Sequence, residues 1–141
     1  MNVISYKIVM ISGSSMVPLL KDSDLILIKK INSFNNLKRK DIIAFLFFLE
    51  TKKIMIKRLI GLPHDKVELD GNLLIINDVI IPEPYVTYTK PSYCKFELSG
   101  DELIVLGDNR VDSFDSRRFG PLKISSIIGK AKFSIKSLKR L

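Results

Sequence analysis

The apolar positions of this chain form short runs separated by turn-forming residues, with almost no apolar spacing at the helical period. Three runs stand out, at residues 24–31, 42–49 and 54–60. The second run holds eight consecutive apolar residues, which is typical of a strand that is buried on both faces. No run approaches the roughly 18 apolar residues of a transmembrane helix. The pattern predicts a mostly-β fold.

The second half of the chain carries hairpin signals. The strongest is Asp70-Gly71, which lies between two short apolar segments. Three prolines make residues 82–99 loop-like or edge-like, because proline cannot donate to a central ladder. Short strands are expected at residues 67–69, 73–76, 79–81 and 103–106, and a closing strand at residues 127–135.

Length and composition narrow the class of protein. With 141 residues, 46% of them hydrophobic, one compact domain over residues 1–141 is expected. The single cysteine, Cys94, excludes an internal disulfide framework. With one histidine there is no basis for a histidine-ligated metal site, so we expect no metal. The sequence has no phosphate-cradling glycine loop and no dinucleotide fingerprint, so we expect no cofactor.

The net charge of +8 is unevenly distributed. Residues 1–115 carry 15 basic and 15 acidic side chains, whereas residues 116–141 carry eight basic and no acidic ones. This predicts one localised cationic surface rather than a generally basic protein. Nucleic-acid binding is disfavoured, because only Phe119 and Phe133 interleave with these cations.

The first candidate for chemistry is the segment Gly13-Ser14-Ser15-Met16-Val17-Pro18. Small residues let another backbone come close, and Pro18 fixes the chain. A serine held there is a candidate nucleophile whose own amide points at a developing oxyanion. The alternative is an ordinary serine-rich turn.

The second candidate is Lys57-Arg58. In a strand, alternation places these two side chains on opposite faces, each among apolar neighbours. A buried lysine has its pKa lowered by some 2–3 units, which lets it serve as a general base near neutral pH. The alternative is an edge strand whose cations reach back to water.

The third candidate is the loop of residues 107–121, which is dense in turn formers, hydroxyls and opposite charges. In it, Ser113 is placed to orient a lysine, and Asp115 to pair with Arg58 or Arg117. It follows directly on an apolar strand, which favours a functional loop over a solvated one. A Ser-His-Asp triad with Ser15 is disfavoured, because His64 and Asp65 are neighbours whose side chains point apart in extended chain.

Together the three segments resemble the motifs of type I signal peptidases, membrane-associated serine proteases with a serine–lysine dyad. Residues 13–18 are similar to their Gly-x-Ser-Met-x-Pro box, and residues 57–65 to their Lys-Arg-x-x-Gly-x-Pro-Gly-Asp box. Residues 107–120 match Gly-Asp-Asn-x-x-x-Ser-x-Asp-Ser-Arg-x-x-Gly at every fixed position. Weaker echoes are Glu83-Pro84-Tyr85 and residues 40–45. The resemblance implies a compact, barrel-like antiparallel β domain with a hairpin extension at about residues 66–101.

The resemblance also implies roles. Ser15 is the nucleophile of a serine endopeptidase that removes signal peptides, Lys57 is its base, and Ser113 hydrogen-bonds and orients Lys57. The Ser15 amide supplies the oxyanion hole. The implied supporting residues are the salt-bridged Asp115, Arg58 and Arg117, the loop-shaping Asp108, Asn109 and Ser116, and Gly13, Ser14 and Met16 beside the oxyanion and substrate.

Departures from the family pattern are few. His64 replaces a usual glycine, and Ser23 and Lys40 stand where glycines are common. Many bacterial members carry a serine hydroxyl two residues before the nucleophile, and here that position is Gly13, as in other branches.

The implied substrates are signal-peptide-bearing precursors, processed at a cell membrane on its extracytoplasmic side. Attachment would be peripheral, or through an anchor segment that this chain lacks. The alternatives are a soluble, cytoplasmic maturation peptidase of the nickel superoxide dismutase type and a LexA-like self-cleaving module. The stretch from Lys66 to Tyr93 favours the signal peptidase, because it resembles that enzyme's hairpin extension.

Overall fold

The structure is a computed structural model that describes residues 3–48, 50–135 and 139–141. Its strands are β1 (Tyr6–Met10), β2 (Leu25–Lys30), β3 (Ile42–Phe48), β4 (Lys52–Gly61), β5 (Lys66–Gly71), β6 (Leu73–Ile76), β7 (Val79–Ile81), β8 (Ser92–Glu97), β9 (Glu102–Leu106), β10 (Leu122–Lys123), β11 (Ile127–Ser134) and β12 (Lys139–Arg140). The α-helix α1 spans Ser116–Phe119, and two 3₁₀ turns span Phe34–Asn36 and Ile124–Ser126. Among the described residues, no helix is long and apolar enough to cross a membrane.

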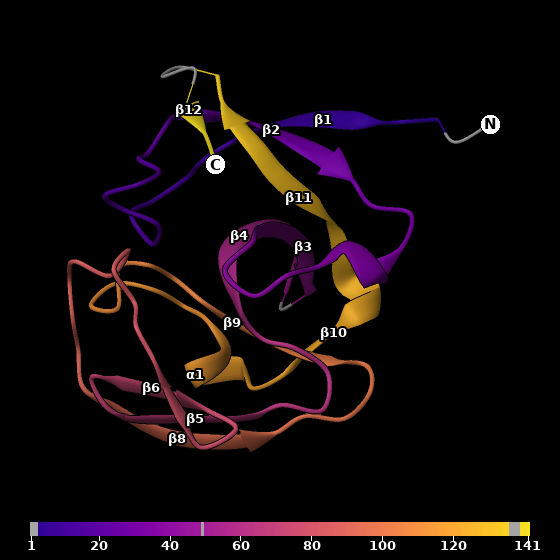
Figure 1. Cartoon of the computed structure of the whole chain (residues 1–141). Coiled ribbons are helices and arrows are strands. Elements are labelled where there is room, and N and C mark those ends of the chain that lie inside the picture. The colour runs from indigo at the N-terminus through magenta and orange to yellow at the C-terminus, as the bar shows by residue number, and fades with distance from the viewer. Residues whose placement is uncertain (1–2, 49, 136–138) are drawn as a thin grey trace.

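The strands form two antiparallel sheets. The larger has the order β1-β2-β11-β3-β4-β9-β10, with β12 added on β11, and the smaller has the order β7-β6-β5-β8. In Figure 1 the small sheet lies at one end of the molecule, and β1, β2 and β12 lie at the other. The mostly-β prediction and the hairpin extension are therefore confirmed.

Strand β3 explains the long apolar run of the sequence. Ile43 and Phe45 pack in one core cluster with Leu59, whereas Ala44 packs in another with Ile28. All five side chains have zero exposure. A strand covered on both faces has no polar face, so alternation disappears from its sequence.

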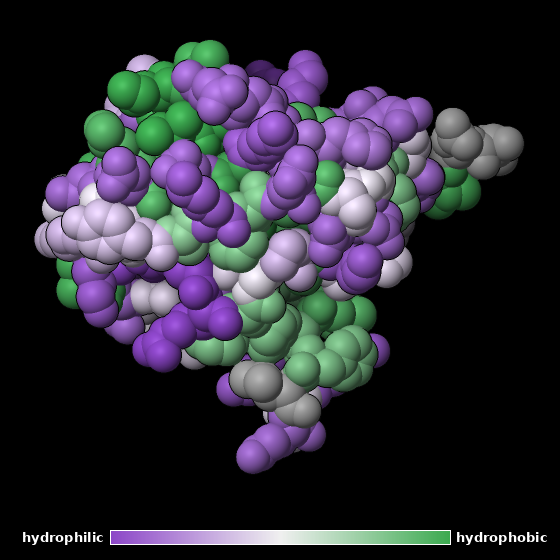
Figure 2. Space-filling view, turned by 90° about the horizontal axis from the view of Figure 1, so that it is seen from below, coloured by the Kyte–Doolittle hydropathy of each residue, from purple (hydrophilic) through white to green (hydrophobic). Residues whose placement is uncertain are grey.

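A third core cluster joins the two sheets. Ile104 and Leu106 of β9 pack there against Val67 and Leu69 of β5. Seen from below (Figure 2), the surface on this side is mostly hydrophilic, with hydrophobic side chains gathered in separate patches. The small sheet is thus fixed to the large one through a shared core rather than through a linker.

Most of the predicted strands are confirmed, within one or two residues at their ends. Leu49, at the end of the predicted run 42–49, lies outside the described residues. Strand β8 is regular but lies at the edge of the small sheet, as the prolines around it suggested. The predicted closing strand is β11, which lies between β2 and β3. Sequence patterning missed β1, an edge strand that is mostly exposed and so carries no burial alternation.

Five described residues other than glycine have a left-handed backbone, Asn77 and Asp78 in a hairpin turn and Ser23, Lys40 and His64 elsewhere. The last three have φ of 67°, 76° and 70°. They stand at the three positions where the resemblance leads us to expect glycine. A side chain in this region costs about 1–2 kcal/mol per residue. The backbone shape of the family motif is therefore kept here without its glycines.

We expect Lys40→Gly to leave the free energy of unfolding unchanged or to raise it by up to about 1 kcal/mol, because relief of strain offsets the added entropy of the unfolded chain. Lys38→Gly is the matched control, since both lysines are exposed in one loop and Lys38 is not among the positive-φ residues. We expect the control to lose about 0.4–1 kcal/mol. Urea unfolding measures both variants, and equal losses in the two would contradict the strain argument.

Candidate active site

Ser15 lies in the turn that connects β1 to β2. The Met16 side chain after it is buried at 1% exposure and packs with Leu20 in the core. The turn is closed by hydrogen bonds from the Val17 amide to the Ser14 carbonyl and from the Leu20 amide to the Met16 carbonyl. Met16 therefore anchors the turn, which holds the Ser15 hydroxyl in place.

Lys57 comes from β4 and is buried at 5% exposure. Its Nζ lies 2.9 Å from Ser15 Oγ and donates to the Ile56 carbonyl at 3.1 Å. Burial lowers the pKa of Lys57 to about 8, and the negative charge of Asp115 opposes that shift. At pH 7 about a tenth of Lys57 is then neutral, roughly 300 times more than at an ordinary lysine pKa. The structure thus places a partly deprotonated amine beside a serine hydroxyl.

Ser113 is close to this pair but makes a different hydrogen bond from the expected one. Its hydroxyl donates to Asp115 Oδ2 at 2.7 Å, and no hydrogen bond between Ser113 and Lys57 occurs among the described residues. Asp115 is buried, and Arg117 donates to both of its oxygens, at 2.9 and 3.0 Å. These bonds hold the pKa of Asp115 below its usual value despite burial. Ser113 is therefore oriented by the same carboxylate that faces Lys57.

Gly107 begins the loop 107–121 and is where this loop meets the turn that carries Ser15, which we name the serine turn. The Gly107 amide donates to Asp115 Oδ2 at 3.0 Å. A Cβ at this position would lie 2.1 Å from Ser113 Oγ and 2.6 Å from the Ser15 carbonyl oxygen. Only glycine permits this approach, which explains the residue type at the start of the third motif.

Two residues of the loop tie it to the serine turn. The Asn109 amide donates to the Ser15 carbonyl at 3.0 Å, and its side chain donates to the Ser14 carbonyl at 3.1 Å. The Ser14 hydroxyl donates to Asp112 Oδ2. Asp112 was not singled out from the sequence, although it lies inside the third motif. Together these hydrogen bonds from the loop 107–121 hold the serine turn in place.

The expected scaffold of Asp115, Arg58 and Arg117 divides into two separate ion pairs. Arg58 pairs with Asp108 through two hydrogen bonds of 2.7 and 2.6 Å. Arg117 pairs with Asp115. The Tyr85 ring lies over the Arg58 guanidinium, with 4.1 Å between them. Lys57 and Arg58 thus have different carboxylate neighbours, as their opposite faces in β4 require.

Other predicted loop residues have structural contacts. Ser116 Oγ, fully buried, accepts a hydrogen bond from the Val105 amide at 2.9 Å, which fixes the end of β9. The His64 ring lies against Gly100. The Asp65 carboxylate bonds instead to Arg39 and Asn77. These contacts leave no triad arrangement at His64, in agreement with the expectation.

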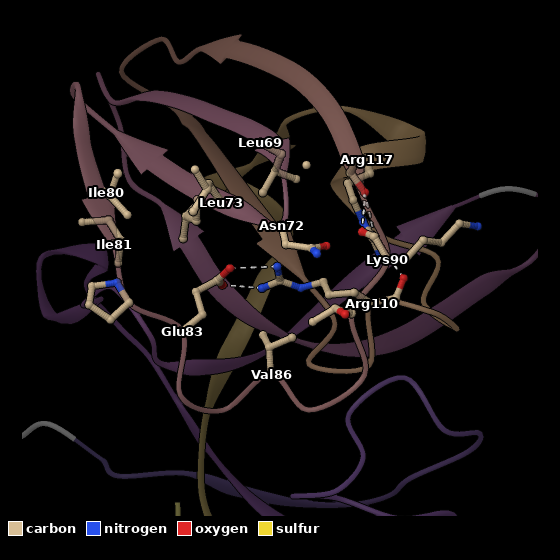
Figure 3. Close-up of a pocket in the computed structure, with 15 residues that line it drawn as sticks. Leu69, Asn72, Leu73, Ile80, Ile81, Glu83, Val86, Lys90, Arg110 and Arg117 are labelled. Atoms are coloured by element: carbon tan, nitrogen blue, oxygen red, sulfur yellow. Dashed lines mark hydrogen bonds and ion pairs between the residues drawn. The ribbon is translucent and has the colours of Figure 1, made fainter.

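A buried ion pair between Arg110 and Glu83, which was not predicted from the sequence, supports the loop 107–121. Arg110 donates to both carboxylate oxygens of Glu83, and its Nε donates to the Gly107 carbonyl at 2.9 Å. The Tyr85 hydroxyl donates to the same Glu83 at 2.8 Å. Figure 3 shows the Arg110 side chain reaching across a pocket toward Glu83. The weak family match at Glu83-Pro84-Tyr85 pointed to Glu83 in the sequence. Nothing in the sequence pointed to Arg110 as its partner.

A hollow of about 440 Å³ adjoins Ser15 and Lys57. It is lined by residues 9–12, residues 53–56, Met16, Phe47 and Phe114. Strand β4 pairs with β9 only from Arg58 onward, so its edge before Lys57 carries no second partner strand among the described residues. A free strand edge beside Ser15 is suited to an extended peptide.

No group of three or more histidine, cysteine, aspartate or glutamate side chains gathers as metal ligands in the part of the chain that the structure describes. The chemistry available at this site is that of a hydroxyl, an amine and a carboxylate. Such a set is typical of a serine hydrolase whose base is a lysine.

The comparisons agree with this class. The family model described as signal peptidase, peptidase S26, matches residues 1–136. The chain therefore belongs to the signal peptidase family, whose members are serine-type endopeptidases.

Named relatives support the assignment. Signal peptidase I of Bacillus caldolyticus is 34% identical over 139 residues, which cover 87% of this chain and 75% of that protein. Signal peptidase I V of Bacillus subtilis is 32% identical, with 89% and 82% covered. The crystal structure of a signal peptidase I from Enterococcus faecalis matches with a TM-score of 0.58 at 34% identity, covering 70% of this chain and 98% of the crystallised one.

We expect the kcat/KM of peptide cleavage to rise with pH, with its midpoint near pH 8, as Lys57 loses its proton. Asp115→Asn removes the charge that raises the pKa of Lys57, so its midpoint lies at lower pH. Asp101→Asn, at an exposed carboxylate, is the control and keeps the wild-type midpoint. The pH–rate profiles of the three proteins measure this, and a wild-type midpoint near 10 would contradict a buried base.

Proposed function

We propose that this signal peptidase family member removes signal peptides from exported precursor proteins through a Ser15–Lys57 dyad. The observation that carries the proposal is the buried Lys57 Nζ at 2.9 Å from Ser15 Oγ. The chain acts as one catalytic domain, since the two sheets share a core. Its active site acts on the extracytoplasmic side of the cell membrane.

In the first step, neutral Lys57 accepts the Ser15 proton while Oγ attacks the scissile carbonyl. The Ser15 amide stabilises the oxyanion. Protonated Lys57 then gives its proton to the leaving amine, and the acyl group remains on Ser15. In the second half, Lys57 takes a proton from the water that attacks the ester. It then returns this proton to Ser15 Oγ as the ester bond breaks, which releases the signal peptide and restores neutral Lys57. Asp115 stabilises the charged form of Lys57 in both halves.

The signal-peptide side of the substrate lies in the hollow beside Ser15. There it pairs as an extended chain with the edge of β4 before Lys57. The apolar lining accepts small side chains just before the cleavage point. A strand added to a preformed edge gives affinity through the backbone, which suits substrates of varied sequence.

We expect Ser15→Ala and Lys57→Ala each to lower kcat/KM for a secretory precursor by more than about 10³-fold, because each removes a member of one reacting unit. His64→Ala is the control and retains activity. Mass spectrometry of the cleaved precursor, with circular dichroism to check folding, measures this. Substantial activity in a folded Lys57→Ala variant would refute the dyad.

We also propose that the chain attaches to an anionic membrane surface. On β1 and just before it, Ile4, Ile8 and Met10 are exposed, at 60%, 59% and 63%. Near Ile4 lies a hollow of about 570 Å³ lined by five lysines, which are Lys29, Lys30, Lys38, Lys130 and Lys132. Apolar residues beside clustered lysines suit the boundary of an anionic bilayer.

These lysines come from distant parts of the sequence. Lys130 lies opposite Lys29 across the β2–β11 ladder, and like charges in that position repel. Asp41 neutralises Lys130 at 2.8 Å. Burial lowers the pKa of Lys132, and Lys130 and Lys29 lower it further. Anionic headgroups would relieve this repulsion.

The expectation of a single cationic surface in residues 116–141 needs correction. Arg117 lies in the active site, Lys123 pairs with Asp101, and Lys130 and Lys132 join lysines from the neutral part of the chain. The pairing register of the strands, rather than position in the sequence, decides which lysines lie side by side. The cationic surface therefore combines lysines from residues 1–115 with lysines from residues 116–141.

We expect binding to phosphatidylglycerol-containing vesicles to weaken with salt and to fall roughly 30-fold in Lys29→Gln/Lys132→Gln, at about 1 kcal/mol per cation. Lys66→Gln/Lys95→Gln, on the small sheet, is the matched control and binds normally. Vesicle sedimentation measures this. Equal binding to purely zwitterionic vesicles would contradict electrostatic attachment.

A further inference from the structure

A second hollow, of about 290 Å³, adjoins the substrate hollow at Phe114 of the loop 107–121. Its lining residues are Lys90, Ser92, Arg110, Val111, Asp112, Ser113, Phe114, Arg117 and Arg118. Phe114 lines both hollows, and Ser113 belongs to the active site. A peptide that passes Ser15 and continues past Phe114 therefore enters this second hollow.

The second hollow is cationic where it is open. Two of its four basic side chains are held in ion pairs, Arg110 with Glu83 and Arg117 with Asp115. Lys90 and Arg118 are exposed and take part in no ion pair among the described residues.

One carboxylate, that of Asp112, lines the same hollow, and it accepts the Ser14 hydroxyl. The Ser14 hydroxyl does not neutralise that carboxylate, so the exposed charges of this hollow are Lys90 and Arg118 against Asp112, a net charge of +1. An incoming acidic side chain beside Lys90 and Arg118 would complement this positive balance.

The second hollow continues into an apolar pocket of about 230 Å³ on the small sheet. The two share Lys90, Ser92, Arg110 and Arg117. In Figure 3, Lys90 and Arg117 lie at one end of this pocket, and Ile80 and Ile81 at the other. The continuous depression, which we name the exit trough, is charged beside the loop 107–121 and apolar farther away.

We propose that the exit trough binds the precursor segment that follows the scissile bond, and that Lys90 and Arg118 select for an acidic side chain among its first residues. This inference rests on the proposed function. The signal-peptide side occupies the hollow along β4, so the remaining chain must leave on the other side of Ser15. The exit trough adjoins Ser113 and shares Phe114 with the substrate hollow, and the net charge of its exposed side chains is positive.

The test compares two precursor peptides that differ only in carrying Glu or Lys at the second and third residues after the cleavage point. At low salt we expect wild-type kcat/KM to favour the Glu peptide by about three- to tenfold, as for exposed ion pairs. Salt at 0.5 M reduces this preference, because it screens exposed charges. Lys90→Glu/Arg118→Glu reverses the preference, and Arg118→Lys retains it.

Lys66→Glu/Lys95→Glu is the control for long-range attraction, because it changes the net charge equally but outside the exit trough. It keeps the wild-type preference. If the reversed double variant fails to fold, Lys90→Gln and Arg118→Gln each give a reduced preference instead.

The outcomes separate the two proposals. If folded wild type cleaves neither peptide, the proposed function is overturned. If both peptides are cleaved equally, or if the trough variants keep the wild-type preference, the exit trough does not select for acid and this inference fails. If Lys66→Glu/Lys95→Glu changes the preference as much as Lys90→Glu/Arg118→Glu does, the preference depends on net charge alone. That result also overturns this inference.

Discussion

The burial of Lys57 beside Ser15 is the constraint on which the rest of the structure depends. A lysine in water keeps its proton at neutral pH and cannot accept another, so the site needs an environment that makes the charged form costly. Removing Lys57 from solvent achieves this, and Asp115 limits how far the pKa falls. In the proposed mechanism, this balance lets Lys57 both take a proton from a hydroxyl and return it to a leaving amine.

Burial of one cation in β4 creates a second problem at the next residue. Alternation turns Arg58 to the opposite face of the same strand, which is also covered. An unpaired guanidinium there would be strongly destabilising, and the structure supplies Asp108 through two hydrogen bonds and Tyr85 through its ring. The Lys-Arg pair of the motif is thus two buried charges on two faces, each with its own carboxylate. The third motif supplies both carboxylates, which explains why these two motifs occur together.

The sequence predicted the strands well and singled out Ser15 and Lys57, which the structure brings together, for identifiable reasons. Strand β3 and the hairpin at Asp70 carry local signals, and Ser15 and Lys57 lie in motifs whose residue types are fixed by chemistry. The partner of each charged group was harder to predict. Ser113 bonds to Asp115 rather than Lys57, and Arg110 pairs with Glu83, because such partners depend on how loops distant in sequence come together. The glycine departures carried more structural information than expected, since Lys40 and His64 keep the left-handed backbone.

The same reasoning applies to the charge of the chain. Counting along the sequence places the whole excess in residues 116–141, yet folding sends those cations in different directions. Arg117 stabilises Asp115, Arg118 opens into the exit trough, and Lys130 meets Lys29 across a strand ladder. Cations of the basic tail therefore contribute to the ion pair with Asp115 and to two separate cationic surfaces. Because these two surfaces line different hollows and share no lysine or arginine, the proposed bilayer contact and the proposed acidic peptide do not compete for the same side chains.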